Sequence, residues 1–225
     1  MPRLLVALVA LCIGVPAVAL AAADTDPKKR LTAADQAKAR SVVLKRGDFV
    51  AGWKKVPAPP ETDEACPGFN PNNSDLTISG EAVGNFEHTQ GLPSVLSFAD
   101  VYVSNADAAA SWARNVKPAL VRCFAHFFLK GAQEEGVKAR VVSQGRIAFP
   151  KVAPRTAAFR IVARITVEGQ SGEAVTVPIT MHIVAVGQGR GEAGMLTTGV
   201  GTGLQMADLR SFAKLLASRL TAAKL

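Results

Sequence analysis

Two neighbouring segments with strict alternation of apolar and polar side chains constrain the fold most strongly. The apolar residues at every second position are Phe159, Ile161, Ala163, Ile165 and Val167 in the first segment, and Val175, Val177, Ile179, Met181 and Ile183 in the second. Because side chains with a period of two lie on one face of a strand, both segments predict strands with one buried face. The turn-forming residues 168–172 between them predict an antiparallel hairpin.

The rest of the chain adds strands and helices to this hairpin. Further strand-like segments cover 76–79, 82–87, 94–103, 137–149 and 192–200. Capping residues and helical periodicity predict helices from Thr32 to near Gly47, over 104–116, over 118–130 and over 204–220. Pro118 either kinks the second of these helices or begins the third. We therefore expect an α+β fold, a central antiparallel β-sheet meander packed with helices, in one domain spanning residues 32–222.

The first 23 residues have the layout of a cleavable secretory signal peptide. Arg3 precedes an uncharged apolar run over 4–20, and the small residues 21–23 form an A-x-A cleavage site. Leu11 is too bulky for the lipobox that would make Cys12 a lipid attachment site. We expect a signal peptide over 1–23, a disordered lead-in over 24–31, and a secreted protein of the cell envelope.

Signal removal leaves two cysteines, Cys66 and Cys123. An even pair of cysteines in an oxidising compartment predicts a disulfide. Closing the loop between them would stabilise the fold by about 4 kcal/mol in the chain-entropy model. A catalytic cysteine would need a free thiol and a histidine partner, so the predicted bridge argues against a thiol enzyme.

The formal net charge is +8 and falls to +7 when Arg3 is removed with the signal peptide. A basic excess favours anionic partners such as cell-wall polymers or phospholipid headgroups, although it also simply keeps a protein soluble. Nucleic acid is not an expected partner, because the protein leaves the cell and its basic residues form no dense run with aromatic residues.

The sequence contains no recognisable catalytic, metal-binding or cofactor-binding motif. None of His88, His126 and His182 has a second histidine or a free cysteine at zinc spacing, and no serine lies in a G-x-S-x-G motif. The glycine-rich run over 199–203 lacks the following strand and acidic residue of a dinucleotide site. We therefore expect no enzymatic activity, no metal and no cofactor.

One face of the predicted hairpin carries the candidate ligand-binding residues. Alternation places five polar side chains opposite the apolar faces of the two strands: Arg160, Arg164, Thr176, Thr180 and His182. Cross-strand pairing would bring them together, and Arg140 and Arg146 of the preceding strand would extend the surface. Guanidinium groups bind carboxylates and phosphates bidentately, so we expect an anionic ligand. The alternative is an ordinary sheet face, exposed to solvent or covered by a helix, whose arginines pair with Asp and Glu.

A short motif and the placement of the cysteines resemble a known family. The motif consists of Leu44, Asp48, Phe49, Gly52 and Trp53, and it is followed by a loop cysteine, a strand region and a helix that bears the partner cysteine. This order resembles the extracellular sensor domain of actinobacterial PknH-type kinases, which also occurs in free-standing secreted proteins, over roughly residues 32–222. The resemblance implies a central antiparallel sheet packed with helices, a ligand-binding groove and no enzymatic activity. The chain differs from kinase-linked members in having no kinase domain, no anchoring helix after signal removal and one candidate disulfide instead of two, so no signalling role or ligand carries over.

The leading prediction is a secreted, non-enzymatic ligand-binding or sensor-like domain of the cell envelope that takes a small or polymeric anionic ligand. One alternative is an envelope protein that contacts wall or membrane components through a basic surface, and a second is a secreted hydrolase with an unrecognised site. The first predicts a concave pocket with convergent Arg and Thr side chains, and the second predicts a continuous flat basic patch. The third predicts a nucleophile, acid or metal cluster in a cleft.

Overall fold

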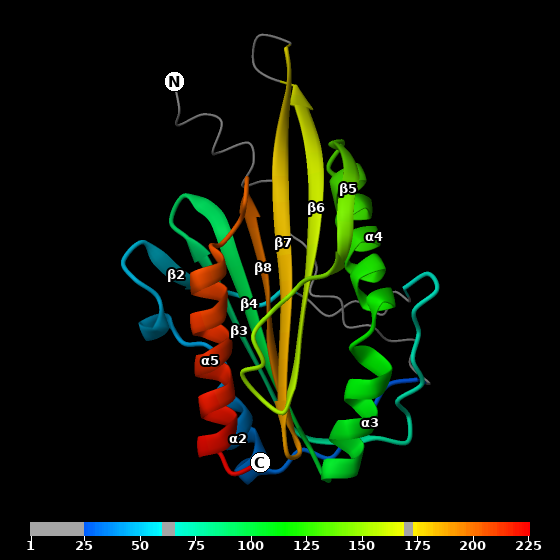
Figure 1. Cartoon of the computed structure of the whole chain (residues 1–225), viewed down its shortest axis with the longest axis vertical. Coiled ribbons are helices and arrows are strands. Elements are labelled where there is room, and N and C mark those ends of the chain that lie inside the picture. Colours follow the sequence, from blue (N-terminus) through cyan, green and yellow to red (C-terminus); the bar gives the residue numbers. More distant parts are fainter. Residues whose placement is uncertain (1–24, 60–65, 169–172) are drawn as a thin grey trace.

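The fold centres on an eight-stranded β-sheet (Figure 1). The computed structural model describes residues 25–59, 66–168 and 173–225. Its strands are β1 (Lys28–Lys29), β2 (Trp53–Val56), β3 (Thr77–His88), β4 (Gly91–Tyr102), β5 (Lys138–Arg146), β6 (Arg155–Glu168), β7 (Ala174–Gln188) and β8 (Gly191–Val200). They lie in the order β1-β3-β4-β8-β7-β6-β5, with β2 also paired to β3, and every pair except β1 with β3 is antiparallel. The predicted α+β fold with a central antiparallel meander is confirmed.

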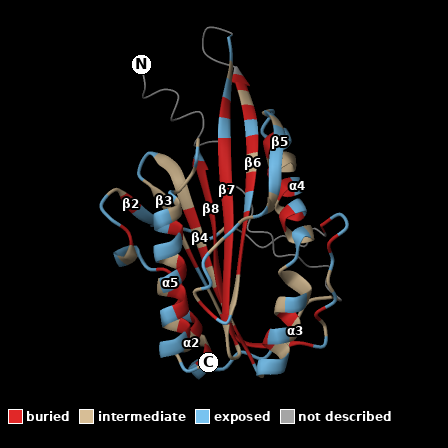
Figure 2. Ribbon diagram, in the orientation of Figure 1, coloured by how far each residue is buried: buried red, intermediate tan, exposed pale blue. Residues whose placement is uncertain are grey.

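Helices cover both faces of this sheet. The helices α2 (Ala33–Val42) and α5 (Met206–Ala222) pack on one face, called the α5 face below. The helices α3 (Asn105–Asn115) and α4 (Pro118–Glu134) pack on the other, the α4 face. Because β7 lies in the middle of the sheet, its residues 179–187 are buried without interruption, as Figure 2 shows along the length of this strand.

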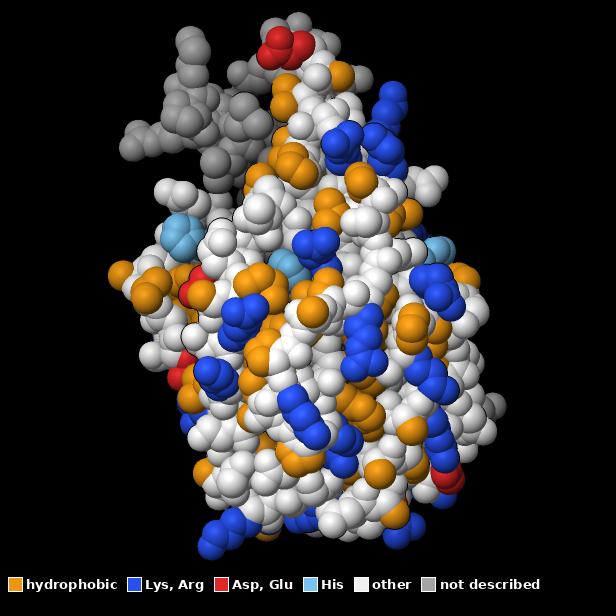
Figure 3. Space-filling view, viewed as in Figure 1, with side chains coloured by type: hydrophobic (Ala, Val, Ile, Leu, Met, Phe, Trp, Pro, Cys, Tyr) orange, Lys and Arg blue, Asp and Glu red, His pale blue; other side chains and the backbone are white. Residues whose placement is uncertain are grey.

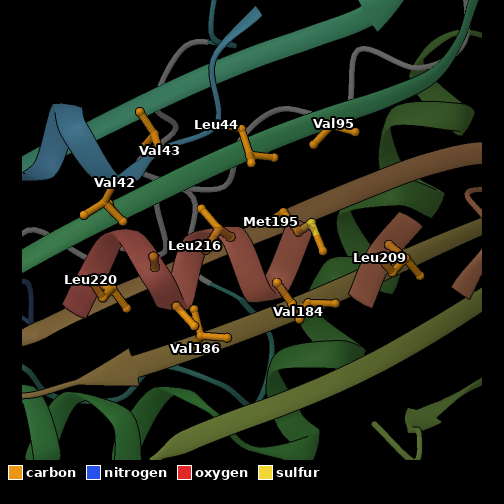
Figure 4. Packing of buried hydrophobic residues seen from close by; sticks show 14 of the residues in the cluster. Val42, Val43, Leu44, Val95, Val184, Val186, Met195, Leu209, Leu216 and Leu220 are labelled. Atoms are coloured by element: carbon orange, nitrogen blue, oxygen red, sulfur yellow. The ribbon is translucent and has the colours of Figure 1, made fainter. Parts of the chain in front are cut away.

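The apolar side of α5 forms the core of the α5 face with the middle strands (Figure 4). This core includes Leu209, Leu216 and Leu220 of α5, Val184 and Val186 of β7, Met195 of β8 and Val95 of β4. Each fully buried leucine of this kind contributes roughly 1.5–3 kcal/mol through the hydrophobic effect. On the flank of α5, Arg219 donates to both carboxylate oxygens of Asp48 at 2.7 and 2.8 Å and to the carbonyl of Val43 at 2.9 Å. The helix is therefore fixed to the segment that follows α2.

The core of the α4 face uses the alternating apolar residues of β6 and β7. Phe159, Ile161 and Ile179 are fully buried there, and Val121 and Phe128 of α4 belong to the same cluster. This arrangement confirms that the predicted hairpin buries its apolar face.

A disulfide joins Cys66 to Cys123 of α4, with the two Cα atoms 5.5 Å apart. The rings of Phe69 and Phe127 are buried beside it. The predicted pairing is confirmed, and it attaches the loop that precedes β3 to a helix of the core.

Capping residues begin two helices where the sequence predicts them. Thr32 Oγ1 accepts a hydrogen bond from the amide of Asp35 at 3.1 Å, and Ser104 Oγ accepts one from the amide of Asp107 at 3.0 Å. Pro118 lies in the first turn of α4, so it begins a new helix.

The end of α2 differs from the prediction. The helix ends at Val42 and not near Gly47, because the next residues turn inward to the core. Leu44 is 1% exposed, and its amide donates to Ser97 Oγ of β4 at 3.2 Å. Packing against the sheet thus overrides the helical periodicity of this segment.

The described part of the expected lead-in is also different. The amides of Lys28 and Arg30 donate to the carbonyls of Leu76 and Ile78, each at 2.9 Å, so that Lys28–Lys29 forms a short strand beside β3. The expectation of disorder over 24–31 is therefore wrong for these residues, because the open edge of β3 offers backbone groups to which this segment binds through its own backbone. The predicted signal peptide and its cleavage site lie outside the described residues. Within the described ranges, no helix is long and apolar enough to cross a membrane.

Candidate functional site

The register of β5, β6 and β7 brings several predicted site residues together. Arg160 lies opposite His182, and Arg164 lies opposite Pro178 on one side and Arg140 on the other. Because directly opposed residues of neighbouring strands point to the same face, Arg140 and Arg164 form a cross-strand pair. Arg160 lies on the same face, four residues before Arg164 in β6, so that the two arginines are about 13 Å apart along the strand.

This face is the α5 face of the sheet. Ala158, two residues before Arg160 in β6, belongs to the core of the α5 face, and its neighbour Phe159 belongs to the core of the α4 face. Alternation along β6 therefore directs the arginines to the side of α5.

Arg146 does not extend this surface as predicted. A β-bulge between Val141 and Ser143 interrupts the alternation of β5. Beyond it, Arg146 lies opposite Phe159, whose ring belongs to the core of the α4 face. The expectation that Arg140 and Arg146 share a face is wrong, because one inserted residue exchanges the two faces of a strand.

Arg140, Arg160 and Arg164, called the arginine cluster below, have no counterion among the described residues. All three side chains are exposed, and none makes a hydrogen bond or ion pair with a described residue. Other arginines of the chain do pair with carboxylates: Arg190 with Asp35, Arg219 with Asp48 and Arg114 with Asp75. In the described part of the chain, these arginines are exposed to solvent, as the alternative of an ordinary sheet face expects, but they do not pair with Asp or Glu.

Thr180 and His182 lie beneath the surface, with exposed fractions of 4% and 3%. The hydroxyl of Thr180 donates to the carbonyl of Gly201 at 2.6 Å and so fixes the turn before α5. His182 Nδ1 and the hydroxyl of its cross-strand neighbour Thr197 are buried without a partner among the described residues. Burial, followed by the charge of Arg160, lowers the pKa of His182 to about 4. The imidazole is therefore a neutral polar group beside Arg160 at pH 7.

A second basic feature of the α5 face was not identified from the sequence. Two open hollows of about 540 and 380 Å³ lie between α5 and residues 148–152, and Pro150 and Lys214 line both of them. We call the combined hollow the basic groove, because its cationic side chains are Lys151, Arg210 and Lys214. Figure 3 shows this side of the molecule, with Lys and Arg side chains spread across it and apolar side chains between them. The available signal was the spacing of Arg210 and Lys214, one turn apart on the last helix.

Two acidic side chains lie opposite each other on the α4 face. Asp100 of β4 pairs with Glu192 of β8, and both are half-buried. Burial, followed by the charge of Glu81, raises the pKa of Asp100 to about 7, and burial, followed by Asp100, raises the pKa of Glu192 to about 8. Ser111 of α3 donates to Glu192 Oε2 at 3.1 Å, so the pair contacts the covering helix, and we assign its effect to stability. The described residues include no group of three or more His, Cys, Asp or Glu side chains placed to hold a metal ion.

Comparison with known proteins does not identify a family for this chain. Neither a protein-family model nor a curated protein matches the chain. The resemblance to the PknH-type sensor domain stays a prediction, and the functional argument depends on the residues of the α5 face.

Proposed function

We propose that this chain is a secreted, non-enzymatic ligand-binding protein of the cell envelope whose arginine cluster binds an anionic ligand. The observation that carries the proposal is the Arg140–Arg164 pair, two exposed guanidinium groups opposite each other with no counterion among the described residues. Like charges directly opposite each other destabilise a sheet. An anion bound between them would remove this destabilisation, whereas a sheet face without a ligand gains no stability from the arrangement.

The chemistry of the cluster suits carboxylates and phosphates. Guanidinium groups bind both bidentately, and their attachment to paired strands reduces the ordering that binding requires. Arg160, beside the neutral His182, offers a second binding position about 13 Å along the strand. A ligand with more than one acidic group therefore fits the cluster better than a ligand with a single acidic group.

Three further features support a secreted binding protein. The N-terminal residues have the pattern of a signal peptide. The disulfide between Cys66 and Cys123 is typical of oxidising compartments. The resemblance to the PknH-type sensor domain implies binding without catalysis.

A second candidate function is attachment to an anionic envelope surface through the whole α5 face. It is favoured by the spread of Lys and Arg side chains over this side of the molecule (Figure 3), and the α5 face carries both the arginine cluster and the basic groove. Such a surface would bind different polyanions with similar affinity, and all of these interactions would weaken together as salt increases.

Calorimetric titration with pyrophosphate and with citrate, as probe anions, tests the arginine cluster. Arg140→Gln/Arg164→Gln should weaken binding at least tenfold and leave the melting temperature unchanged or higher, because the substitutions remove a like-charge pair. The matched control is Lys117→Gln/Arg122→Gln, which removes two exposed cations at α4. This control loses the same net charge and should bind both anions normally.

Three outcomes would contradict the proposal. Normal binding with a lower melting temperature would show that the arginines are structural. Because β5 lies at the edge of the sheet, its charges also oppose pairing with another chain, and a variant that self-associates but binds normally would assign the pair to that role. An equal loss of binding in the cluster variant and the control would favour the second candidate function.

A further inference from the structure

The basic groove is a fixed part of the fold. Its outer wall is the segment between β5 and β6, which crosses in front of the sheet toward α5 in Figure 1. Ile147, Phe149 and Val152 of this segment pack against the core of the α5 face. The hydroxyl of Thr156 accepts from the amide of Ala153 at 3.1 Å and donates to its carbonyl at 3.0 Å. These contacts hold the wall in place beside the helix.

Cations without a counterion among the described residues line both walls. Lys151 comes from the crossing segment, and Arg210 and Lys214 come from α5. All three are exposed, and none forms an ion pair with a described residue. Arg210 and Lys214 lie four residues apart, about 6 Å along the helix axis, so both reach the same space. Asp208, two residues from Arg210, lies on a different side of the helix.

Apolar side chains share these walls. They are Phe149, Pro150, Val152 and Ala217. Cations alone would suit any anion, but this combination suits a ligand whose phosphate is joined to hydrocarbon. An anionic phospholipid in a membrane has this composition, with a phosphate headgroup above its acyl chains. A wall polymer or a sugar phosphate would leave the solvent-facing parts of these side chains uncovered.

We infer that the basic groove binds the phosphate headgroup of an anionic phospholipid and docks the α5 face on a membrane surface. The inference rests on the proposed anion-binding role of this face, and it adds a ligand class and a site separate from the arginine cluster. In this arrangement Arg210, Lys214 and Lys151 contact the phosphate, and Phe149 lies toward the acyl boundary. Other cations of the same face (Figure 3) would contact neighbouring headgroups.

Co-sedimentation with lipid vesicles tests the inference. The mature protein should bind vesicles of phosphatidylcholine that contain about one third phosphatidylglycerol, and should not bind phosphatidylcholine alone. Arg210→Gln/Lys214→Gln should bind the anionic vesicles roughly thirtyfold more weakly, since each basic residue near such a surface contributes about a factor of five. Lys117→Gln/Arg122→Gln, with the same change in charge at α4, should bind like the wild type. Both variants replace exposed side chains, and their melting temperatures verify that they fold.

Several results would overturn the inference, and they leave the proposed function separately testable. An equal loss of vesicle binding in both double variants would show that the interaction depends only on net charge. Displacement from the vesicles by millimolar glycerol phosphate would show that the groove holds a free phosphate and not a lipid. If the protein does not bind vesicles but binds pyrophosphate normally at the arginine cluster, the inference about the groove is overturned and the proposed function is retained. If vesicle binding depends on Arg210 and Lys214 but no anion binds at Arg140 and Arg164, the proposed function is overturned and the lipid-binding role of the groove is retained.

Discussion

The partly buried ion pair between Asp35 and Arg190 attaches α2 to the sheet. Asp35 is 8% exposed. Arg190, in the turn between β7 and β8, donates to its two carboxylate oxygens at 2.7 and 2.9 Å and to the carbonyl of Tyr102 at 2.8 Å. The hydroxyl of Ser79 donates to the same carboxylate at 2.7 Å. One acidic side chain thereby joins α2, β3 and the β7–β8 turn.

The pKa of this carboxylate gives the size of its contribution to stability. Hydrogen bonding from Arg190, supported by Ser79, lowers the pKa of Asp35 from 3.8 to about 2. One pKa unit corresponds to about 1.4 kcal/mol, so the ionised side chain contributes about 2 kcal/mol to the free energy of unfolding at neutral pH. Because the folded pKa is depressed, this contribution is complete above the unfolded value of 3.8 and is lost as the pH falls through about 2. Asp35→Asn also leaves the guanidinium without its counterion, and we expect a total loss of about 3 kcal/mol at pH 7.

Urea denaturation with the disulfide intact measures this loss. The difference in unfolding free energy between the wild type and Asp35→Asn should be largest at neutral pH and should narrow as the pH approaches 2. Asp75→Asn is the matched control, because Asp75 also pairs with an arginine, Arg114, but its side chain is 61% exposed, and exposed pairs contribute little. A variant as stable as the wild type at pH 7, or a difference that does not change with pH, would refute the reasoning.

Three further predictions concern stability. Glu192→Gln should raise the melting temperature at pH 8, because the raised pKa of Glu192 makes its ionisation unfavourable in the folded state. This difference in melting temperature should disappear as the pH falls below about 4.5, where the glutamate is protonated in both the folded and the unfolded state. Cys66→Ala/Cys123→Ala, which removes a bridge across a sequence separation of 57, should lower the unfolding free energy by about 4 kcal/mol, and a loss below about 1 kcal/mol in urea titration would contradict this. Gly80→Ala should be strongly destabilising, because its Cβ would lie 2.3 Å from the carbonyl oxygen of Asp35; a melting temperature equal to that of the wild type would show that α2 moves freely on β3.

Features that depend on neighbouring residues could be predicted from the sequence. Thr32 and Ser104 cap helices through amides three residues away, so local composition is sufficient. The pairing of Arg160 with His182 follows from the short turn between two alternating segments, because turn length fixes the register of a hairpin.

Features that depend on one inserted residue or on a distant partner could not be predicted from the sequence. The bulge after Val141 exchanges the faces of β5, and no side-chain pattern in this segment marks it. Lys28 joins β3 through backbone atoms alone, which leaves no signal in the side chains. Arg210 and Lys214 resemble an ordinary exposed helix stripe until the segment over 148–152 is placed beside them. The groove is therefore a property of tertiary packing, although each of its residues is unremarkable in the sequence.

The placement of the acidic residues distinguishes the α5 face from a basic surface that only maintains solubility. Asp35, Asp48 and Asp75 are each paired with an arginine outside the cluster, and Asp100 and Glu192 lie on the other face of the sheet with raised pKa values. Solubility is well served by interspersed charges of both signs. Here the described carboxylates leave the arginine cluster and the basic groove without counterions, so the excess positive charge of the chain is concentrated on one face and its field has a direction. Because exposed charges are screened over about 10 Å at an ionic strength of 0.1 M, binding of anionic partners to this face should weaken as salt is added, while the melting temperature of the free protein stays the same or rises.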